Sequence, residues 1–567
     1  MKFSSLSQYL LKLENTSSRI EITKILAELF KLSQPEEIDK IVYLVLGKLA
    51  PTYKSIVFNL ADKLVLQAIA KAYEKKLEEV KKIYKQKGDL GNTAESLSKN
   101  STSTDSVEKV YEMLMDIAKV GGEGSVESKI DGLASILQNA DTLSARFIAR
   151  IPVGKLRLGF SDKTIIDALS WMENNDKSGS KALVRAYEVL PDIGLLSSVV
   201  RTKGVQKAAT SIGPVLGVPV MPMLASRIKS AQEMIEKMGE VTVEPKYDGL
   251  RVLIHYKKCK WVKAFTRNLN DISQMFPELD KLNLAVNAQE LILDSEAVGL
   301  DETTKKLADF QTTMQRRRKH DIEGSALKIP LIFNIFDVLY VDGKNLMDEA
   351  YLNRRKILQK IVSETKIFKI TPFVVTSDPK IIEGEYKKHI NQGLEGIMVK
   401  KANTAYVPGR TGYRWVKMKE TEKAMGKLSD TLDCVVLGFS SGQGKRTAFG
   451  VGQFLAAVRD GDTYKSVTKV GTGLTDEQFR ELKTRLTKII TKEKPKEYDV
   501  HKDLFPDFWV SPKVVVELAA DDITVSPKHT VGYALRFPRL VNFRDDKSPE
   551  QATTVKEVKN LYKLQKK

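Results

Sequence analysis

A proline-rich segment divides the chain into two parts with different hydrophobic patterns. Residues 213–225 contain three prolines and cannot continue a helix. Before this segment, apolar residues recur three and four positions apart, as in Ser55–Ala70, and this spacing predicts helices. After it, short apolar runs rich in β-branched residues predict strands with helices between them. The chain is therefore predicted to fold into at least two structurally different parts, with a boundary close to residue 213.

The part before the boundary is predicted to be one all-α domain, residues 1–212. Its helical pattern is interrupted by the polar stretch Lys87–Thr104 and by the glycines of Gly121–Gly124. Both stretches indicate loops inside the domain, because Gly, Ser, Thr and Asn favour turns.

The part after the boundary is predicted to contain two further domains. Residues 213–420 have an α+β pattern, with predicted strands at Val241–Glu244, Arg251–Tyr256, Leu291–Glu296, Leu331–Asp337 and Gly396–Lys400. A charged stretch, Lys419–Ser429, leads into residues 421–567. There, short strands and Gly-rich turns predict a small β-barrel of the oligonucleotide-binding (OB) fold. This last domain also has a predicted helix at Asp476–Thr491 and a basic helical tail at Val555–Lys567.

The composition predicts a polyanionic partner and excludes several classes of protein. The chain has 91 Lys and Arg residues against 72 Asp and Glu residues, a formal charge of +19, which favours nucleic acid. No apolar run approaches the length of a membrane span, and no signal peptide is recognisable, so we expect an intracellular protein without membrane contact. With only Cys259 and Cys434, a disulfide framework and a four-Cys zinc module are excluded.

The candidate nucleophile is a lysine at the end of a predicted strand. Lys246 is followed by Tyr247-Asp248-Gly249, a sequence that by itself is most often an exposed hairpin turn. Downstream, Asp294 and Glu296 alternate along a strand and project from one face. Such a pair can hold a divalent cation or a ribose hydroxyl, and a solvated polar face is an equally weighted alternative.

A second candidate group is basic. The same alternation places Trp415, Lys417 and Lys419 on one face of a predicted strand. Two ammonium groups side by side favour an anionic ligand, although an exposed basic edge strand is a reasonable alternative. The indole on the same face favours a cleft.

Seven motifs in order resemble the motif series of ATP-dependent DNA ligases, and the resemblance covers nearly the whole chain. The motifs are Lys246–Gly249, Phe265–Asn268, Asp294–Glu296, Phe336–Asp337, Glu395–Lys400, Trp415–Lys419 and Arg536–Arg539. The resemblance implies a helical DNA-binding domain, a nucleotidyltransferase (adenylation) domain and an OB-fold domain. It also implies the substrates ATP and nicked double-stranded DNA, with Mg²⁺ as the metal.

The resemblance implies that Lys246 is the catalytic residue. Its amine would attack the α-phosphorus of ATP, form a lysine–AMP phosphoramidate and release pyrophosphate. AMP would then pass to the 5′-phosphate of a nick, and the 3′-hydroxyl would displace it to form a phosphodiester bond. An unperturbed lysine, with a pKa of about 10.4, is almost wholly protonated at pH 7. Positive charge from Arg251, Lys417, Lys419 and bound Mg²⁺ would favour the neutral amine.

The resemblance also implies how the nucleotide and the metal are bound. Glu244 would contact the adenine, Arg251 and Arg267 the sugar and phosphates, and Phe336 would stack on the purine, with ordinary core packing as a serious alternative for Phe336. The expected nucleotide-binding set is Glu244, Arg251, Arg267, Glu296, Phe336, Arg410, Lys417 and Lys419. Glu296 would hold the ribose or the metal, and Glu395 would assist in holding the metal.

Two parts of this assignment depend on further arginines. Many relatives carry an arginine where Thr411 stands here, so Arg410 or Arg414 would take over that contact with phosphate. In the last domain, Arg536 and Arg539 would close over the triphosphate, and they would affect self-adenylation more than the sealing of a pre-adenylated nick.

DNA binding is expected to depend on contacts with phosphates, which carry no base information. The candidates in the helical domain and the last domain are Arg146, Arg150, Lys155, Arg157, Lys163, Lys445 and Arg446. For each of them alone, a solvated surface position is the more common explanation.

Two other functions fit part of the pattern. An RNA ligase or an mRNA capping guanylyltransferase shares the nucleophilic lysine, but the long helical region favours a DNA ligase. A non-catalytic DNA-binding protein is disfavoured because the expected catalytic residues are present. We expect a monomer in the cytoplasm of a prokaryote, associated with the nucleoid. Gln8–Leu13 begins like a sliding-clamp peptide but lacks its paired aromatics, and a clamp partner stays open.

Overall fold

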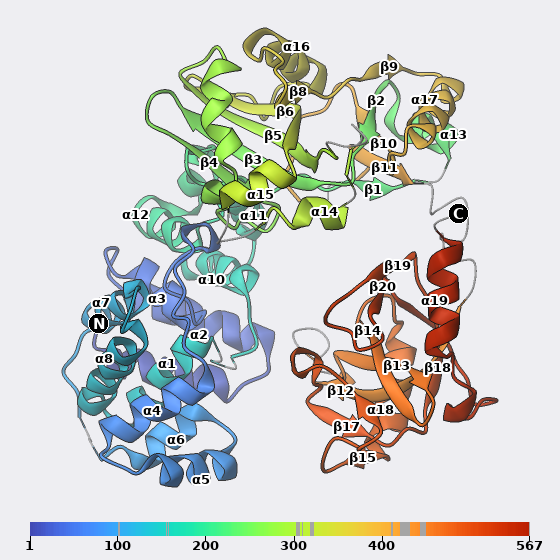
Figure 1. Cartoon of the computed structure of the whole chain (residues 1–567). Helices are drawn as coiled ribbons and strands as arrows, with labels where there is room; N and C mark the ends of the chain where they lie inside the picture. Colours follow the sequence, from blue (N-terminus) through green and yellow to red (C-terminus); the bar gives the residue numbers. More distant parts are fainter. Residues whose placement is uncertain are drawn as a thin grey trace. The chain divides into compact units, whose positions relative to one another are not determined.

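The computed structural model divides the chain into two compact units, Met1–Lys417 and Met418–Lys567 (Figure 1). It describes all residues except 100–101, 155, 157, 229, 302–306, 309, 318–321, 410–411, 420–430, 443–448 and 566–567. Each unit has hydrophobic core clusters of its own. Among the described residues, no helix combines the length and the apolar character that a bilayer crossing requires.

Helices form the first part of the first unit, as predicted. They are α1 (Phe3–Glu14), α2 (Arg19–Leu32), α3 (Ile38–Val45), α4 (Asp62–Ala72), α5 (Leu77–Lys87), α6 (Leu90–Leu97), α7 (Val107–Lys119), α8 (Ser125–Asn139), α9 (Thr142–Arg150), α10 (Asp162–Asn174), α11 (Ser180–Val189) and α12 (Ile193–Ser211). Each turns an apolar stripe inward; α1, for example, buries Leu6, Leu10 and Leu13. Short 3-10 turns follow α3 and α9, at Thr52–Lys54 and Ile151–Val153.

Two details of the helical prediction are wrong. The stretch Lys87–Thr104 contains α6, whose first turn is capped by the Asp89 carboxylate, which accepts a hydrogen bond from Asn92 N at 2.9 Å. The helix predicted over Ser55–Ala70 begins only at Asp62, because Ser55 and Asn59 have left-handed φ angles of 51° and 53°. The loop at Gly121–Gly124 is confirmed between α7 and α8.

The second part of the first unit is built on two sheets. The five-stranded sheet has the order β1 (Ser226–Arg227), β11 (Trp415–Lys419), β10 (Gly396–Lys401), β2 (Val241–Lys246) and β9 (Val374–Thr376). The six-stranded sheet has the order β4 (Trp261–Thr266), β3 (Leu250–Lys257), β5 (Glu290–Gly299), β6 (Leu331–Val341) and β7 (Lys344–Asn345), with β8 (Phe368–Ile370) beside β6. All five strands predicted for this part are present.

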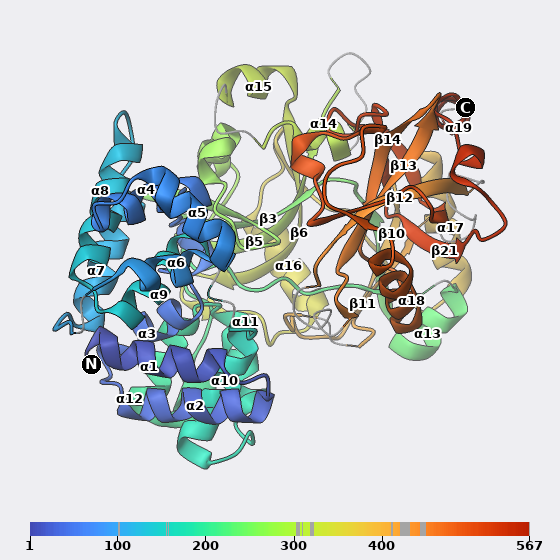
Figure 2. The ribbon, with the colours of Figure 1, turned by 90° about the horizontal axis from the view of Figure 1, so that it is seen from below.

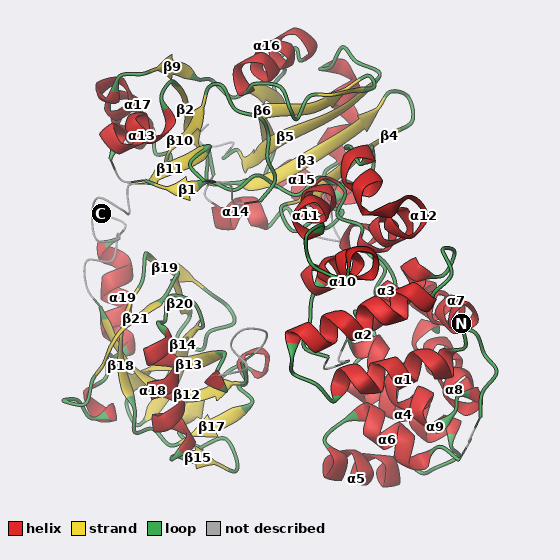
Figure 3. Ribbon diagram, turned by 180° about the vertical axis from the view of Figure 1, so that it is seen from behind, coloured by secondary structure: helices red, strands yellow, loops and turns green. Residues whose placement is uncertain are grey.

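Helices cover these sheets, and Figure 3 shows them in red against the yellow strands. They are α13 (Ala231–Met238), α14 (Phe310–Met314), α15 (Ile322–Lys328), α16 (Tyr351–Ile361) and α17 (Pro379–Asn391), with 3-10 segments at Ser273–Met275 and Pro277–Leu284. α17 contacts β10 and β2, and α16 contacts β6. The chain therefore passes from one sheet to the other between β2 and β3, next to the candidate nucleophile.

The second unit is rich in strands. They are β12 (Leu432–Ser440), β13 (Gln453–Asp460), β14 (Thr463–Val470), β15 (Ile490–Thr491), β16 (Tyr498–Asp499), β17 (Phe508–Val510), β18 (Val515–Ala519), β19 (Asp522–Val525), β20 (Tyr533–Arg536) and β21 (Arg539–Phe543). Figure 2 shows β12, β13 and β14 side by side, in antiparallel pairing. The helices are α18 (Asp476–Thr487) and α19 (Val555–Leu564), with 3-10 turns at Lys502–Leu504 and Pro549–Gln551. The helix predicted to reach Thr491 thus ends earlier, because Ile490 and Thr491 pair with β17.

Candidate active site

Lys246 lies where the chain leaves one sheet for the other. It is the last residue of β2 and pairs with Gly396 of β10, while Glu244 pairs with Met398. The turn to β3 requires a glycine at position 249, because a Cβ there would lie 2.4 Å from the Ala297 carbonyl oxygen. The strand and this tight turn together hold Lys246 at the junction of the two sheets.

The Lys246 amine forms an ion pair with a carboxylate. Its Nζ donates to Oε2 of Glu395, and the two side chains are 17% and 20% exposed, so the pair remains accessible to a ligand. The Glu395 backbone N–H in turn donates to the Lys246 carbonyl at 3.2 Å. The nucleophile and carboxylate predicted from the sequence are therefore in direct contact.

Glu296 faces the same region from β5, where it pairs with Arg251. Desolvation raises the pKa of Glu296 to about 7, although the charges of Lys246 and Arg251 oppose this rise. Desolvation favours the neutral form of this carboxyl group. A cation beside it would stabilise the ionised form and lower the pKa again.

The residues at this junction fit Mg²⁺ that is bound together with a phosphate ligand. No group of three or more His, Cys, Asp or Glu residues with metal-binding geometry occurs in the described part of the chain. Mg²⁺ usually takes one or two protein carboxylates and completes its shell with phosphate oxygens and water. Glu296 and Glu395 are two such carboxylates, and both interact with Lys246.

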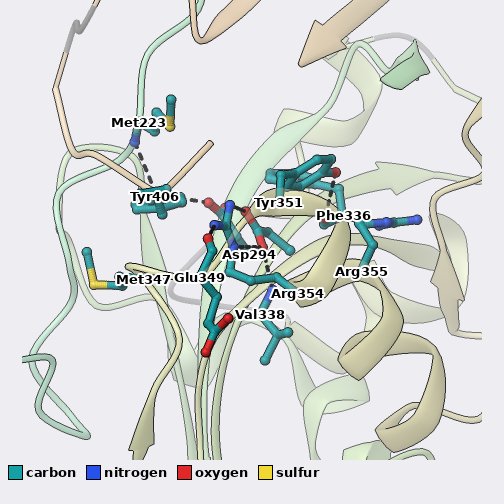
Figure 4. A network of polar contacts seen from close by, with 12 residues as sticks. Met223, Asp294, Phe336, Val338, Met347, Glu349, Tyr351, Arg354, Arg355 and Tyr406 are labelled. Carbon is teal, nitrogen blue, oxygen red and sulfur yellow. Dashed lines mark hydrogen bonds and ion pairs between the residues drawn. The ribbon is translucent and has the colours of Figure 1, made fainter. Parts of the chain in front are cut away.

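Arg251 is held by hydrogen bonds to Asp294, Met223 and Tyr406, the three partners that Figure 4 labels. Its Nε and Nη2 bind the two carboxylate oxygens of Asp294 at 2.9 and 2.6 Å, and its Nη1 donates to the Met223 carbonyl at 2.7 Å. Nη2 also lies 3.2 Å from the Tyr406 hydroxyl. Asp294 is fully buried and forms an ion pair with Arg251. The two carboxylates that were predicted to act together therefore have different partners: Glu296 faces Lys246, and Asp294 binds Arg251.

A second buried group surrounds Glu244. Lys400 Nζ lies 2.7 Å from Oε2 of Glu244 and 2.9 Å from the Tyr351 hydroxyl. The Tyr351 hydroxyl also donates to Glu244 Oε1. The Lys400 ammonium lies 4.3 Å from the ring centre of Phe336 and 4.5 Å from that of Trp415.

Phe336 is half-buried at the edge of this group, and Trp415 is nearly fully buried. The two rings meet edge to face, with centroids 6.0 Å apart at an interplanar angle of 78°. The ring of Phe336 is thus fixed by its neighbours without being fully enclosed in the core.

A fourth ion pair fixes the strand that carries Phe336. Arg354 of α16 binds Asp337 through two hydrogen bonds of 2.8 and 2.9 Å, and both side chains are fully buried. Arg355 donates to the carbonyl of Phe336 at 2.9 Å. Sequence reasoning missed Tyr351, Arg354, Arg355, Lys400 and Tyr406 as members of the site. The only signal in the sequence was that Asp337 and Lys400 lie inside the motifs Phe336–Asp337 and Glu395–Lys400.

Replacing Arg354 with leucine should lower the free energy of unfolding by about 3–5 kcal/mol, because the Asp337 carboxylate would stay buried without its cation. Urea unfolding followed by tryptophan fluorescence measures the loss. Lys369→Leu is the matched control: its pair with Glu364 spans 3.4 Å, with side chains 43% and 47% exposed. Breaking such a surface pair costs less than about 1 kcal/mol. Equal losses in the two variants would contradict a structural role for Arg354.

The remaining predicted nucleotide-binding residues are placed as follows. Arg267 is exposed just after β4 and lines a small cavity with Arg251, Asp294 and Tyr406. Lys417 and Lys419 are half-buried on β11, on the strand face they share with Trp415. Arg410, like Thr411, lies outside the described residues.

In the second unit, Arg539 forms an ion pair of 2.7 Å with Asp521 and is 45% exposed. The Arg536 guanidinium lies 5.2 Å from the ring centre of Phe537. Both arginines are therefore at or near the surface of their own unit.

The predicted DNA-binding set needs one correction. Arg150 is 2% exposed, and its guanidinium donates to Asp89 at 2.8 Å, Glu14 at 3.1 Å and Asn92 at 3.1 Å. A phosphate cannot reach this group, so the prediction for Arg150 is wrong. Its neighbour Arg146 is half-buried and pairs with Glu14 at 2.9 Å.

Of the other predicted DNA-binding residues, Lys163 is exposed on α10. Lys155, Arg157, Lys445 and Arg446 lie outside the described residues.

Matches to known proteins extend along the whole chain. Residues 2–170 match the family model "DNA ligase N terminus", residues 222–419 match "ATP dependent DNA ligase domain", and residues 447–547 match "ATP dependent DNA ligase C terminal region". The chain is 39% identical to a "Probable DNA ligase" of Dictyoglomus thermophilum, covering 100% of this chain and 98% of that protein. It is also 39% identical to a "DNA ligase" of Pyrobaculum islandicum, covering 100% and 99%.

A solved structure titled "Pmar-Lig_Pre." shares the fold, with a TM-score of 0.54 at 18% identity over 95% of this chain and 99% of that one. The motif residues of the first unit lie around the junction of its two sheets. Three family models match most of the chain, and the relatives align over all of it. The chain therefore belongs to the family of ATP-dependent DNA ligases.

Proposed function

We propose that Lys246 is the nucleophile of this DNA ligase. The enzyme seals nicks in duplex DNA with ATP: AMP passes from ATP to the enzyme and then to the 5′-phosphate, and the 3′-hydroxyl displaces it. In the first step, the lone pair of Lys246 Nζ forms a P–N bond to the α-phosphorus, and pyrophosphate leaves. The single observation that supports this role is the accessible contact between Lys246 Nζ and Glu395 at the junction of the two sheets.

The Lys246 ammonium must lose a proton before it can attack. The carboxylate of Glu395 already accepts a hydrogen bond from Nζ and is the acceptor within reach of that proton. Lys417 and Lys419 would add positive charge that favours the neutral amine and binds phosphate. Glu296 and Glu395 would hold Mg²⁺, which supplies charge neutralisation on the phosphates when it is bound.

Around this centre, we assign Glu244 and Phe336 to the adenine, and Arg251 and Arg267 to the sugar and phosphates. The half-buried ring of Phe336 is compatible with stacking on a purine. For Arg251, four of its five N–H groups donate within the protein, so its effect on the nucleotide would come from a fixed guanidinium and its charge. Arg410 would contact phosphate in place of the arginine that relatives carry at position 411.

The domain assignment follows the same scheme. Residues 1–212 would bind DNA, residues 213–420 would carry out adenylation, and residues 421–567 would form an OB-fold domain. Arg536 and Arg539 of that domain would close over the triphosphate during self-adenylation. The antiparallel strands of the second unit and its apolar core are compatible with a small barrel.

For DNA, we retain Arg146, Lys155, Arg157, Lys163, Lys445 and Arg446 as phosphate contacts. We also propose a cytoplasmic monomer of a prokaryotic, nucleoid-associated type. The segment Gln8–Leu13 lies inside α1, where Leu10 and Leu13 are fully buried, so it could bind a sliding clamp only if α1 unfolded. A clamp partner would need another segment.

Intact-mass spectrometry tests the proposed nucleophile. After incubation with ATP and Mg²⁺, the protein should gain about 329 Da, the mass of an AMP group bound as a covalent intermediate. Peptide mapping should place this acid-labile group on Lys246, and GTP and NAD in parallel should give no adduct. An adduct on another residue, or none at all, would overturn the assignment.

A further inference from the structure

Tyr406 lies at the centre of the network around Arg251, although no motif predicted it. It is 3% exposed, in the segment that joins β10 to β11. Its hydroxyl lies 3.1 Å from Asp294 Oδ2, 3.2 Å from Arg251 Nη2 and 3.1 Å from the Met223 backbone nitrogen. A tyrosine hydroxyl has one proton to donate and two lone pairs that accept. It donates to the carboxylate and accepts from the two N–H groups, so all of its capacity is used.

The network leaves Arg251 little freedom to move. Asp294 holds one edge of its guanidinium through two hydrogen bonds, and the Met223 carbonyl holds another N–H group. The guanidinium carbon lies 5.5 Å from the ring centres of both Phe336 and Trp415. The Tyr406 ring packs edge-on against Trp415, with centroids 5.8 Å apart. Tyr406 thus contacts the arginine, its carboxylate partner and the aromatic wall beside it.

Tyr406 also links Arg251, through hydrogen bonds, to the segment around Met223 that leads from the helical part to the two sheets. Met223 bonds to the Tyr406 hydroxyl through its N–H and to Arg251 through its carbonyl. Two nearby residues of this segment are anchored as well: Leu224 N donates to the Gly409 carbonyl at 2.8 Å, and Met221 N donates to the Glu188 carbonyl of α11 at 2.9 Å. The hydroxyl of Tyr406 is therefore one hydrogen bond away from both the entering segment and Arg251.

We propose that Tyr406 is a positioning residue for the adenylation step: its hydroxyl fixes the Arg251 guanidinium, through Asp294 and the Met223 backbone, in the orientation in which it faces ATP. This inference rests on the proposed role of Arg251. Burial raises the pKa of Tyr406, so the hydroxyl keeps its proton and continues to donate to Asp294. Without the hydroxyl, the Met223 N–H and one Arg251 N–H lose their acceptor, and the guanidinium is free to tilt.

The test is a double-mutant cycle on the rate of lysine–AMP formation at saturating ATP, measured in the full chain by single-turnover labelling. Tyr406→Phe keeps the ring and removes only the hydroxyl, and we expect a fall of about 10- to 100-fold. Arg251→Lys should be at least as slow. If Tyr406 acts through Arg251, Tyr406→Phe should slow the Arg251→Lys enzyme by less than about twofold.

The cycle separates positioning from a merely structural effect. Tyr340→Phe is the matched control, since Tyr340 lies on β6 and its hydroxyl donates to Glu290 at 3.2 Å, a residue outside the proposed site. Its adenylation rate should equal that of the wild type. If the fold-losses in rate of the two substitutions multiply in the double variant, Tyr406 acts independently of Arg251 and the inference is wrong. A wild-type rate for Tyr406→Phe beside a slow Arg251→Lys enzyme would overturn it too.

A different result separates this inference from the proposed function. If Arg251→Lys adenylates at the wild-type rate, the role proposed for Arg251 fails first, and the inference fails with it. Should Tyr406→Phe not fold, Tyr406→His takes its place, because an imidazole keeps a ring at this position but cannot donate one hydrogen bond and accept two as the hydroxyl does. The same cycle with Arg251→Lys then gives the same two readings.

Discussion

Replacing Lys246 with alanine is expected to lower the rate of self-adenylation by on the order of 10⁴–10⁶-fold, the range in which loss of a catalytic residue acts on a covalent mechanism. No other lysine among the described residues shares its position at the end of β2, in contact with Glu395. Without the amine, no P–N bond forms and ATP stays intact. Single-turnover transfer of label from ATP to the protein measures the effect.

Two comparisons sharpen this experiment. Lys257→Ala removes a lysine from the same domain, where Lys257 forms a partly exposed pair with Glu290 at 2.6 Å, and it should adenylate normally. A nick that already carries AMP on its 5′-phosphate bypasses the amine, so the Lys246→Ala enzyme should still seal it at a measurable rate. Label on the Lys246→Ala chain at the wild-type rate would move the nucleophile to another residue.

Local rules predicted most of the fold. The spacing of apolar residues predicted the helical part, and short apolar runs predicted β2, β3, β5, β6 and β10 of the two sheets, because both patterns follow from the geometry of a single element. The errors also have local causes. The left-handed residues Ser55 and Asn59 delay α4, and the Asp89 cap starts α6 inside a stretch that is polar by composition. Neither feature changes hydrophobic periodicity.

The candidate site was predictable only where its chemistry lies within a motif. Lys246 and Glu395 were expected together, and the structure places them in contact. Tyr406 was not expected, because its role depends on Asp294, which is 112 positions away in the chain. Tyr351 similarly acts on Glu244, 107 positions away. Contacts at such separations are set by how the two sheets pack, and no local pattern encodes them.

Arg150 shows that a local pattern can also predict a role that long-range contacts then prevent. Its place among the basic residues of the helical domain suggested a phosphate contact, yet its partner is Asp89, 61 positions earlier in the chain. Gly91 allows this approach: a Cβ there would lie 2.6 Å from Arg150 Nε. The sequence shows the charge of such a residue, whereas burial and pairing decide whether that charge is available to DNA.

The affinity for nicked duplex should fall steeply with salt. If the ligase contacts about 6 to 10 phosphates, its affinity should drop roughly 10³- to 10⁵-fold between 50 and 200 mM salt, because each contact releases condensed counterions. The formal charge of +19 is compatible with a binding surface of this size. Fluorescence anisotropy of a labelled nicked duplex, measured without ATP across this salt range, gives the slope. A flat response would rule out binding dominated by phosphate contacts.

The slope also tests which cations reach the DNA. Lys163 is exposed, so Lys163→Gln should make the log–log slope less steep by about one phosphate contact. Arg150 forms ion pairs with Asp89 and Glu14, so Arg150→Met should leave the slope of the folded protein unchanged. It should instead lower the melting temperature, because it leaves buried Asp89 without its cation. If Arg150→Met folds normally and loses slope as Lys163→Gln does, its buried ion pairs do not describe the DNA-bound protein.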